Sequence, residues 1–549
     1  MSSRPLVRAM MLAVSMTLPG IALPAGDEFN LPSLGDTSSS IMSRQQEYQL
    51  GRTWLTMLRG AVPTLDDPQL KSFVEDLTRG LAETSQLSDR RLAFVLIDSP
   101  QLNAFAAPGG VVGVNGGLFL HARSEAEFAS VLAHELAHLS QRHFARGLEQ
   151  QQRMQVPFMT AMLASIVLAA AGGGDAGFAA LATTQAAAIQ EQRRFSRQNE
   201  QEADRIGILN LEKAGYDPRA MPDMFERLAQ LSRYDTTPPE FLLTHPVSQS
   251  RMADTRNRAE QMAGSGRTDS LNFQMMRARV QLKYEQSPGL SAKRFRALLD
   301  DNGGEHAAAR YALALALSRG GEHGEATSTL APLLEATPDD LTVNLAQIEI
   351  DTNAGRLAQA LERNRRMQQR YPDNFPLAFS EADLLMKQQQ YAAAERAINR
   401  LANQRESDPD VWYLAAEIRG LAGNILGVHL ARAEYFKQTG DLQQAGQHRG
   451  LIGFQVLRPA VEIMQARCAQ AIHIVPEIGV GQIAAEDFVL RQPAFQPECN
   501  QRLARLARQR ALRRKKGEFG ELLSDRAATA RPGERGARDP ARVYAPVRI

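Results

Sequence analysis

The sequence predicts an α+β protein: a mainly helical domain with a small sheet, followed by an α-solenoid. Three observations carry this prediction. Apolar segments with strand character lie between residues 92 and 120, and a capped helix follows them directly. From about residue 270, helix pairs succeed one another without strands. Aromatic residues make up only 6% of the chain and alanine is abundant, which favours helix over sheet.

The first residues have the pattern of a secretory signal peptide. Two arginines supply a positive region, and an apolar stretch then runs from Ala9 to Leu18. This stretch is too short to cross a bilayer, which needs about 20 apolar residues. Small residues allow cleavage after Ala22 or Ala25, so we expect residues 1–25 to be removed during export.

The next segments supply helices and then strands. Residues 43–90 are predicted to be helical, because apolar side chains recur every three or four positions. Residues 92–98 are predicted to form a buried strand. Residues 103–120 alternate glycine with apolar side chains and are predicted to form a strand hairpin or an edge strand.

A long helix is predicted after these strands. Ser124 is a favourable N-cap, and Glu127 stands where a capping box needs an acidic side chain. The helical pattern continues to about Arg153. The start of this helix is therefore well defined by the sequence, and its end is only approximate.

This helix carries the motif His134-Glu135-Leu136-Ala137-His138. His134 and His138 are spaced i, i+4, so they lie on one face where both imidazoles can reach one Zn²⁺ ion. Glu135 projects beside them and can accept a proton from water that the ion acidifies. The motif predicts a hydrolytic metalloenzyme with one Zn²⁺ per chain and Glu135 as its catalytic base. His143 falls off the ligand face and is interpreted as structural.

Two apolar segments follow, at residues 156–171 and 176–189, separated by three glycines. Each is too short to be a membrane span. A helical hairpin is predicted, and both packing on the protein and peripheral contact of residues 156–189 with a membrane surface stay open. Another helix is predicted over Phe195–Ala214.

The second half of the chain contains an internal repeat. Ala326, Ala360 and Ala394 recur every 34 residues, and Pro338 and Pro372 have the same spacing. A 34-residue period of paired helices is the signature of tetratricopeptide repeats, and an irregular helical bundle is the alternative. Stacked repeats of this kind form a concave surface that binds protein segments.

The C-terminal region does not continue the repeat. Residues 502–516 contain eight Lys or Arg, which fits either a basic amphipathic helix or a solvated charged face. The composition of residues 517–549 predicts disorder. Cys468 and Cys499 are the only cysteines, so a cysteine-ligated zinc site is excluded, and whether the two form a disulfide stays open.

A later segment completes a known family pattern. The histidine motif followed by Glu200-Gln201-Glu202-Ala203-Asp204 resembles the membrane-linked gluzincins, the metallopeptidases that include HtpX and the CAAX prenyl proteases. The resemblance implies a zincin-type fold in which Glu200 is the third metal ligand. It also implies that Asp204 belongs to the catalytic set by orienting a ligand histidine. Glu202 lies outside the pattern.

Two further segments match the same family. The resemblance of Thr244-His245-Pro246-Val247 implies that His245 can approach the metal as a regulatory fourth ligand; an ordinary loop histidine is the alternative. Residues 103–106 resemble the family's edge strand, with a purely structural strand as the alternative. The residues expected to contact an extended substrate are Asn103, Ala104, Phe105 and Arg251.

The combination of export signal, catalytic motif and repeats resembles the periplasmic members of this family. The resemblance implies an exported zinc endopeptidase, also chaperone-like, that acts in quality control and assembly of outer-membrane β-barrel proteins. Unfolded or stalled outer-membrane proteins and the β-barrel assembly machinery are the implied partners, and the periplasm, at the periphery of the outer membrane, is the implied location. The net charge of +2 gives no reason to expect nucleic acid.

The expected organisation follows from these observations. It comprises a signal peptide (1–25), a zinc metallopeptidase domain (43–262), a tetratricopeptide repeat domain (270–450) and a basic, partly disordered C-terminal region (451–549). Two alternatives for function stay open: a repeat-based chaperone or scaffold with little or no hydrolysis, and a metalloenzyme that cleaves cell-wall material.

Overall fold

The structure of the protein is a computed structural model. It describes residues 42–152, 196–234, 239–262, 266–285, 287–301, 303 and 305–451. Four expectations lie outside these residues: the signal peptide, the apolar segments at 156–189, the basic C-terminal region beyond residue 451, and the pairing of the two cysteines.

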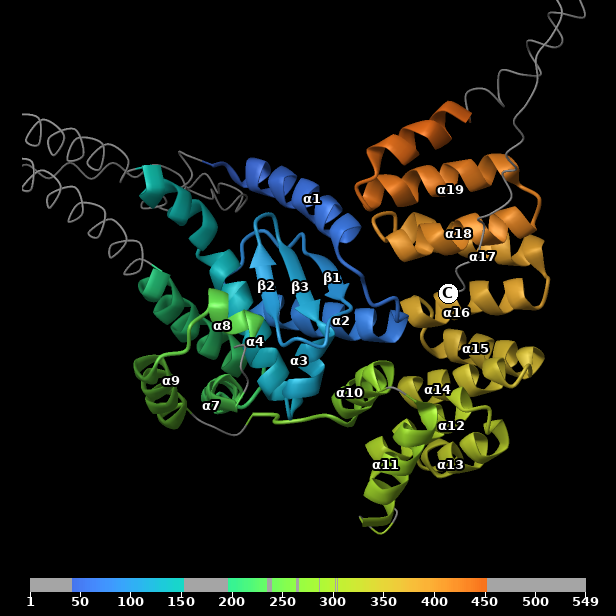
Figure 1. The fold of residues 1–549 in the computed structure, drawn as a ribbon, viewed down its shortest axis with the longest axis horizontal. Helices are drawn as coiled ribbons and strands as arrows, with labels where there is room; N and C mark the ends of the chain where they lie inside the picture. The colour runs from blue at the N-terminus through green and yellow to red at the C-terminus, as the bar shows by residue number, and fades with distance from the viewer. Residues whose placement is uncertain are drawn as a thin grey trace, which may run out of the picture. The chain divides into compact units, whose positions relative to one another are not determined.

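The first part of the described chain has helices around one small sheet (Figure 1). Its elements are α1 (Arg44–Ala61), α2 (Pro68–Thr84), β1 (Ala93–Ile97), β2 (Ala104–Ala107), β3 (Val111–Asn115), α3 (Gly116–His121), α4 (Glu125–Ser140), α7 (Ala220–Tyr234), α8 (Glu240–Thr244) and α9 (Gln249–Gln261). Residues 143–152 and 196–213 are also helical. The predicted α+β class, mainly helical with a small sheet, is confirmed.

The sheet has the strand order β1-β3-β2. Strand β1 pairs in parallel with β3, and β2 pairs antiparallel with β3, so β2 lies at an edge of the sheet. The expected hairpin within residues 103–120 is therefore present, but its last part is wrong. Residues 116–121 form helix α3, whose start is fixed by the preceding loop: Gly117 donates its N–H to the carbonyl of Ser99 and lies too close to the backbone of Gln101 for any side chain.

Helix α4 is held in the centre of the hydrophobic core. Ser124 caps it as predicted, since its hydroxyl accepts a hydrogen bond from the backbone N–H of Glu127. A cluster of aromatic rings from α2, α3, α4 and the later helix α10 (Leu271–Tyr284) surrounds its first turns, with centroids 4.5–6.2 Å apart. Its members are Phe73, Phe119, Phe128 and Phe273. Such packing fixes the position of the helix that carries the histidine motif.

The predicted continuation of this helix to about Arg153 is wrong. Helix α4 ends at Ser140, and a new helix occupies residues 143–152. Arg142 between them has a φ of 51°, in the left-handed region that non-glycine residues rarely adopt. Its guanidinium holds the turn, because it donates to the carbonyl of Met42 and to the carboxylate of Glu47. This turn redirects the chain just after the second motif histidine.

The second part is a stack of helix pairs, drawn from green to orange in Figure 1. Its elements are α10 (Leu271–Tyr284), α11 (Pro288–Asp301), α12 (Ala307–Arg319), α13 (His323–Ala336), α14 (Leu341–Asn353), α15 (Leu357–Arg370), α16 (Phe375–Lys387), α17 (Tyr391–Gln404), α18 (Pro409–Leu421) and α19 (Ile425–Gln438). The repeating alanines at 326, 360 and 394 are fully buried in α13, α15 and α17. The predicted α-solenoid is confirmed. Within the described ranges, no helix combines the length and apolar character that crossing a bilayer requires.

Candidate metal centre

Helix α4 and the helix at residues 196–213 meet where the motif histidines lie. Residue 207 is a glycine, and a Cβ atom there would lie 3.1 Å from both Cα and N of His134. The absence of a side chain at Gly207 therefore allows close contact between the two backbones. This contact brings Glu200 and Asp204, on the second helix, up to the histidines.

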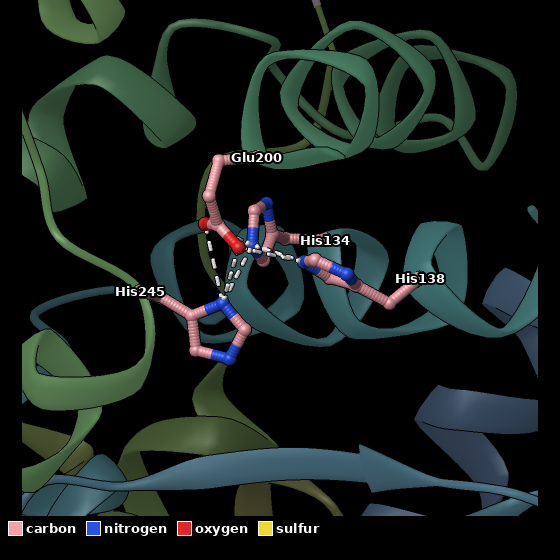
Figure 2. A group of neighbouring side chains, drawn as sticks. All are labelled: His134, His138, Glu200 and His245. Atoms are coloured by element: carbon pink, nitrogen blue, oxygen red, sulfur yellow. Dashed lines mark hydrogen bonds and ion pairs between the residues drawn. The ribbon is translucent and has the colours of Figure 1, made fainter. Parts of the chain in front are cut away.

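Donor atoms from three segments converge at this point (Figure 2). Nε2 of His134 lies 3.0 Å from Nε2 of His138, and each of these atoms lies 3.4 Å from a carboxylate oxygen of Glu200. Nδ1 of His245 lies 3.0 Å from Glu200 Oε1 and 3.4 Å from Nε2 of His134. In a tetrahedral zinc site with bonds of about 2.0–2.1 Å, donor atoms are ~3.3 Å apart. The observed spacings match that geometry.

The other ring nitrogen of each motif histidine is already engaged. Nδ1 of His134 lies 3.0 Å from Asp204 Oδ1, and Nδ1 of His138 lies 2.8 Å from Nδ1 of His143. Both Nε2 atoms therefore face Glu200 and each other, where two neutral imidazoles would present their lone pairs to a shared cation. Two imidazoles and one carboxylate are the donor set of many zinc peptidases, so the residues fit a divalent metal.

The charges of the cluster depend on one another. Burial by itself lowers the pKa of His134, but hydrogen bonds to Asp204 and Glu200 outweigh burial and raise that pKa to about 10. Burial would raise the pKa of Glu200, yet His134 and His245 hold it far below its usual range. Burial and the charge on His134 lower the pKa of His138. A proton on His134 thus neutralises the buried carboxylates, a role that a divalent cation would take over.

Behind the donor cluster lies a buried ion pair. Nε and one terminal nitrogen of Arg251 each donate to a carboxylate oxygen of Asp204 at 2.7 Å, and another terminal nitrogen lies 3.0 Å from Glu200. Burial would raise the pKa of Asp204, but these bonds and His134 lower it. Asp204 is thereby kept ionised, with Oδ1 3.0 Å from Nδ1 of His134, a position from which a carboxylate can orient the imidazole.

Glu135 lies beside the cluster and is 2% exposed. Its Oε2 accepts a 2.8 Å hydrogen bond from the backbone N–H of Ala106 in β2. Its Oε1 has no hydrogen-bond partner among the described residues and lies 3.5 Å from Nε2 of His245. Burial raises the pKa of this carboxyl group. A buried carboxylate with one free oxygen beside a metal site is placed to act as a general base.

Comparison with known proteins decides the family. A model of peptidase family M48 matches residues 65–259, and a tetratricopeptide repeat model matches residues 352–418. The β-barrel assembly-enhancing protease of Escherichia coli (strain K12) is 35% identical over 439 residues, which are 79% of this chain and 89% of that protein. This chain belongs to peptidase family M48. It is therefore a protease, and its family implies a metal cofactor, as the sequence predicts.

Other relatives of this M48 peptidase differ in how much of the chain they match. The β-barrel assembly-enhancing protease of Yersinia pestis is 35% identical over 424 residues, 77% of this chain and 87% of that protein. The mitochondrial metalloendopeptidase OMA1 of Arabidopsis thaliana is 30% identical over 221 residues, 40% of this chain and 42% of that protein. The similarity to β-barrel assembly-enhancing proteases thus extends well beyond the length of the M48 match.

The edge strand of the M48 domain borders a cleft of about 290 Å³. Asn115 N donates to Asn103 O, so the alternate residues Ala104 and Ala106 direct their backbone groups away from β3 and toward the free edge. Phe105 and Ala106 line the cleft together with Glu135, His138 and His245.

The four residues expected to contact substrate differ in their position relative to the cleft. The carbonyl of Asn103 pairs with β3. Ala104 is fully buried, backbone included, and does not line the cleft, although its backbone groups point away from β3. Phe105 lines the cleft and packs edge-on against Trp54. Arg251 is not among the residues that line the cleft and is buried against Asp204 and Glu200, so its contact with substrate stays a prediction and a supporting role for it is suggested by its position.

One interaction of this site was not predicted from the sequence. His143, interpreted there as structural, contacts His138 and also lines the cleft. A straight helix from Ser124 to about Arg153 would have carried its side chain away from the motif. The turn at Arg142 brings it back, and the one signal in the sequence was a histidine soon after the motif.

Proposed function

We propose that this M48 peptidase is an exported zinc endopeptidase that assists the assembly and quality control of outer-membrane β-barrel proteins. The observation that carries the enzymatic part is the convergence of His134, His138 and Glu200, with Glu135 beside them. Zinc is the metal whose usual donors and tetrahedral spacing this cluster fits best.

Each side chain then has a defined task. A zinc ion in this site would supply Lewis acidity toward water and toward the scissile carbonyl oxygen. Glu135 takes a proton from water at its free oxygen and returns it to the leaving nitrogen. Asp204 holds His134 in the tautomer that leaves Nε2 free, and Arg251 holds Asp204.

The substrate is proposed to bind as an extended strand at the free edge of β2. Backbone groups of Ala104 and Ala106 point to that edge, and main-chain pairing there is independent of side-chain sequence. The N–H of Ala106 is bonded to Glu135 in this structure, which holds the base directly beside the edge strand. This arrangement suits cleavage of unfolded segments, which can adopt the strand conformation.

His245 is proposed to act as the regulatory fourth ligand. Its Nδ1 contacts Glu200, its Nε2 faces Glu135, and its ring stacks on Phe241 at 4.8 Å between centroids. The imidazole therefore occupies the space beside the base that water and substrate need. Movement of the short α8–α9 connection that carries His245 would open that space.

The cellular role is proposed from the relatives. Two proteins with the name β-barrel assembly-enhancing protease share about a third of their residues with this chain across both the catalytic and repeat regions. The tetratricopeptide repeats offer a surface for protein partners, for which we propose unfolded or stalled barrels and their assembly machinery. Export to the periplasm is proposed from the signal-peptide pattern of residues 1–25.

Glu135→Gln tests the proposal. This variant should keep its metal and lose hydrolysis of unfolded casein by about 10²–10⁴-fold, the contribution of a general base. Glu240→Gln, an exposed change on α8, is the matched control and should cleave like the wild type. Peptidoglycan is assayed in parallel. Undiminished casein cleavage by Glu135→Gln, or hydrolysis of peptidoglycan alone, would overturn the proposed mechanism.

A further inference from the structure

His138 has a chain of partners behind it that the proposed mechanism does not use. Its Nδ1 lies 2.8 Å from Nδ1 of His143. On the other side of the His143 ring, Nε2 lies 3.2 Å from Oε2 of Glu202, and that same oxygen accepts a 2.9 Å bond from Arg146. The chain therefore runs from the donor cluster to the protein surface, where Glu202 and Arg146 are each about one-third exposed.

The hydrogen positions along this chain follow from its two ends. Nε2 of His138 faces Glu200 and His134, so in a metal-loaded site it carries no hydrogen and Nδ1 must carry it. Nδ1 of His143 must then accept that hydrogen, which leaves the hydrogen of His143 on Nε2. That hydrogen points at Glu202, whose carboxylate accepts it. Only one tautomer of each ring satisfies every contact.

The contact between His143 and His138 depends on a backbone conformation that non-glycine residues rarely adopt. His143 follows Arg142, whose left-handed φ of 51° is anchored through its guanidinium to Met42 and Glu47. A continuous α4 would place residue 143 five positions after His138, more than a turn along the helix and on another face. The break turns the imidazole of His143 back onto that of His138 and buries it.

We propose that His143 and Glu202 are positioning residues that fix the tautomer and ring orientation of His138. The site then has two supporting arms: Asp204 with Arg251 behind His134, and His143 with Glu202 and Arg146 behind His138. The inference rests on the proposed metal binding by His134, His138 and Glu200. Its first consequence is retention of the metal, and its effect on catalysis follows from that.

Metal retention in the full-length protein tests the inference. Zn²⁺-loaded protein is treated with a chromogenic chelator, and Co²⁺-loaded protein gives the d–d spectrum of the site. His143→Leu should weaken metal affinity roughly 10- to 100-fold, the usual loss when such a supporting partner is removed, and should alter the Co²⁺ spectrum. His143→Asn should restore both readouts to near wild type, because the amide oxygen accepts at the position of Nδ1.

A second pair of variants, at Glu202, tests the same role without changing the buried histidine, where a substitution could disturb folding. Glu202→Leu, at a partly exposed position, should also speed metal loss, and Glu202→Gln, which keeps an acceptor, should not. Glu212→Leu on the same helix and His323→Leu on α13 are matched controls that should retain metal like the wild type. If wild type, His143→Leu and Glu202→Leu all retained metal equally, the positioning role would be overturned and the proposed function would stand. If the wild type itself bound no metal, the proposed function would be overturned.

Discussion

Arg251→Met separates a supporting role for this arginine from a role in substrate binding. The guanidinium is 4% exposed and donates two 2.7 Å bonds to Asp204, with Glu200 at 3.0 Å. Methionine keeps most of the side-chain volume and removes the charge, which leaves two buried carboxylates short of a cation. Removing one partner of a buried ion pair costs about 3–5 kcal/mol.

This loss is measured as thermal unfolding of chelator-treated protein, so that bound metal does not mask it. At about 2–4 °C per kcal/mol for a domain of this size, the Tm should fall by about 6–20 °C. The matched control is Arg258→Met on the same helix, whose exposed pair with Asp254 should contribute only about 0–1 kcal/mol. If Arg251→Met proved as stable as Arg258→Met and only raised the KM for peptides, the supporting role would be refuted.

Three further predictions concern the same site. His245→Ala should raise basal cleavage of unfolded casein several-fold, since it frees the space beside Glu135; an unchanged or lower rate would contradict a regulatory fourth ligand. Gly207→Val should weaken metal binding measured by chelator competition by about tenfold or more, because its Cβ meets the backbone of His134, whereas Gly80→Val on α2 meets no neighbour and should bind metal normally. Removing the metal should lower the Tm, and added Zn²⁺ should restore it, by preferential binding to the folded state; a Tm insensitive to both treatments would argue against a preformed site.

Much of the fold was predictable because its signals are local. The 34-residue spacing of Ala326, Ala360 and Ala394 reflects a repeating need for a small side chain where the second helix of each pair packs. Ser124 marks the start of α4 because a hydroxyl at an N-cap satisfies a backbone N–H that is otherwise left unpaired. Such requirements are met within a few residues and can be read from a short window.

The failures in the fold arise where distant contacts override local preference. The pattern that predicted a continuous helix beyond Ser140 contains no glycine or proline at the break. Arg142 adopts a left-handed conformation because Met42 and Glu47, about 95–100 residues earlier, hold its guanidinium. Helix α3 likewise depends on close contact of Gly117 with the backbone at Gln101.

In the candidate site, too, local features were predictable and features set by distant contacts were not. The i, i+4 spacing of His134 and His138 places both on one helical face by geometry alone. The family resemblance supplied Glu200, but no spacing rule could indicate that Arg251 turns inward to Asp204 instead of facing the cleft. A charged side chain in a polar segment has no local sign of burial; only the paired carboxylate, 47 residues away, explains it.

The most direct test of this account is the metal content of the purified full-length protein, measured by inductively coupled plasma mass spectrometry beside its Glu200→Gln variant. Convergence of two imidazoles and one carboxylate on a single ion predicts close to one zinc per wild-type chain and a large loss in the variant. Wild-type protein without stoichiometric metal, or a variant that holds zinc as firmly as the wild type, would contradict it.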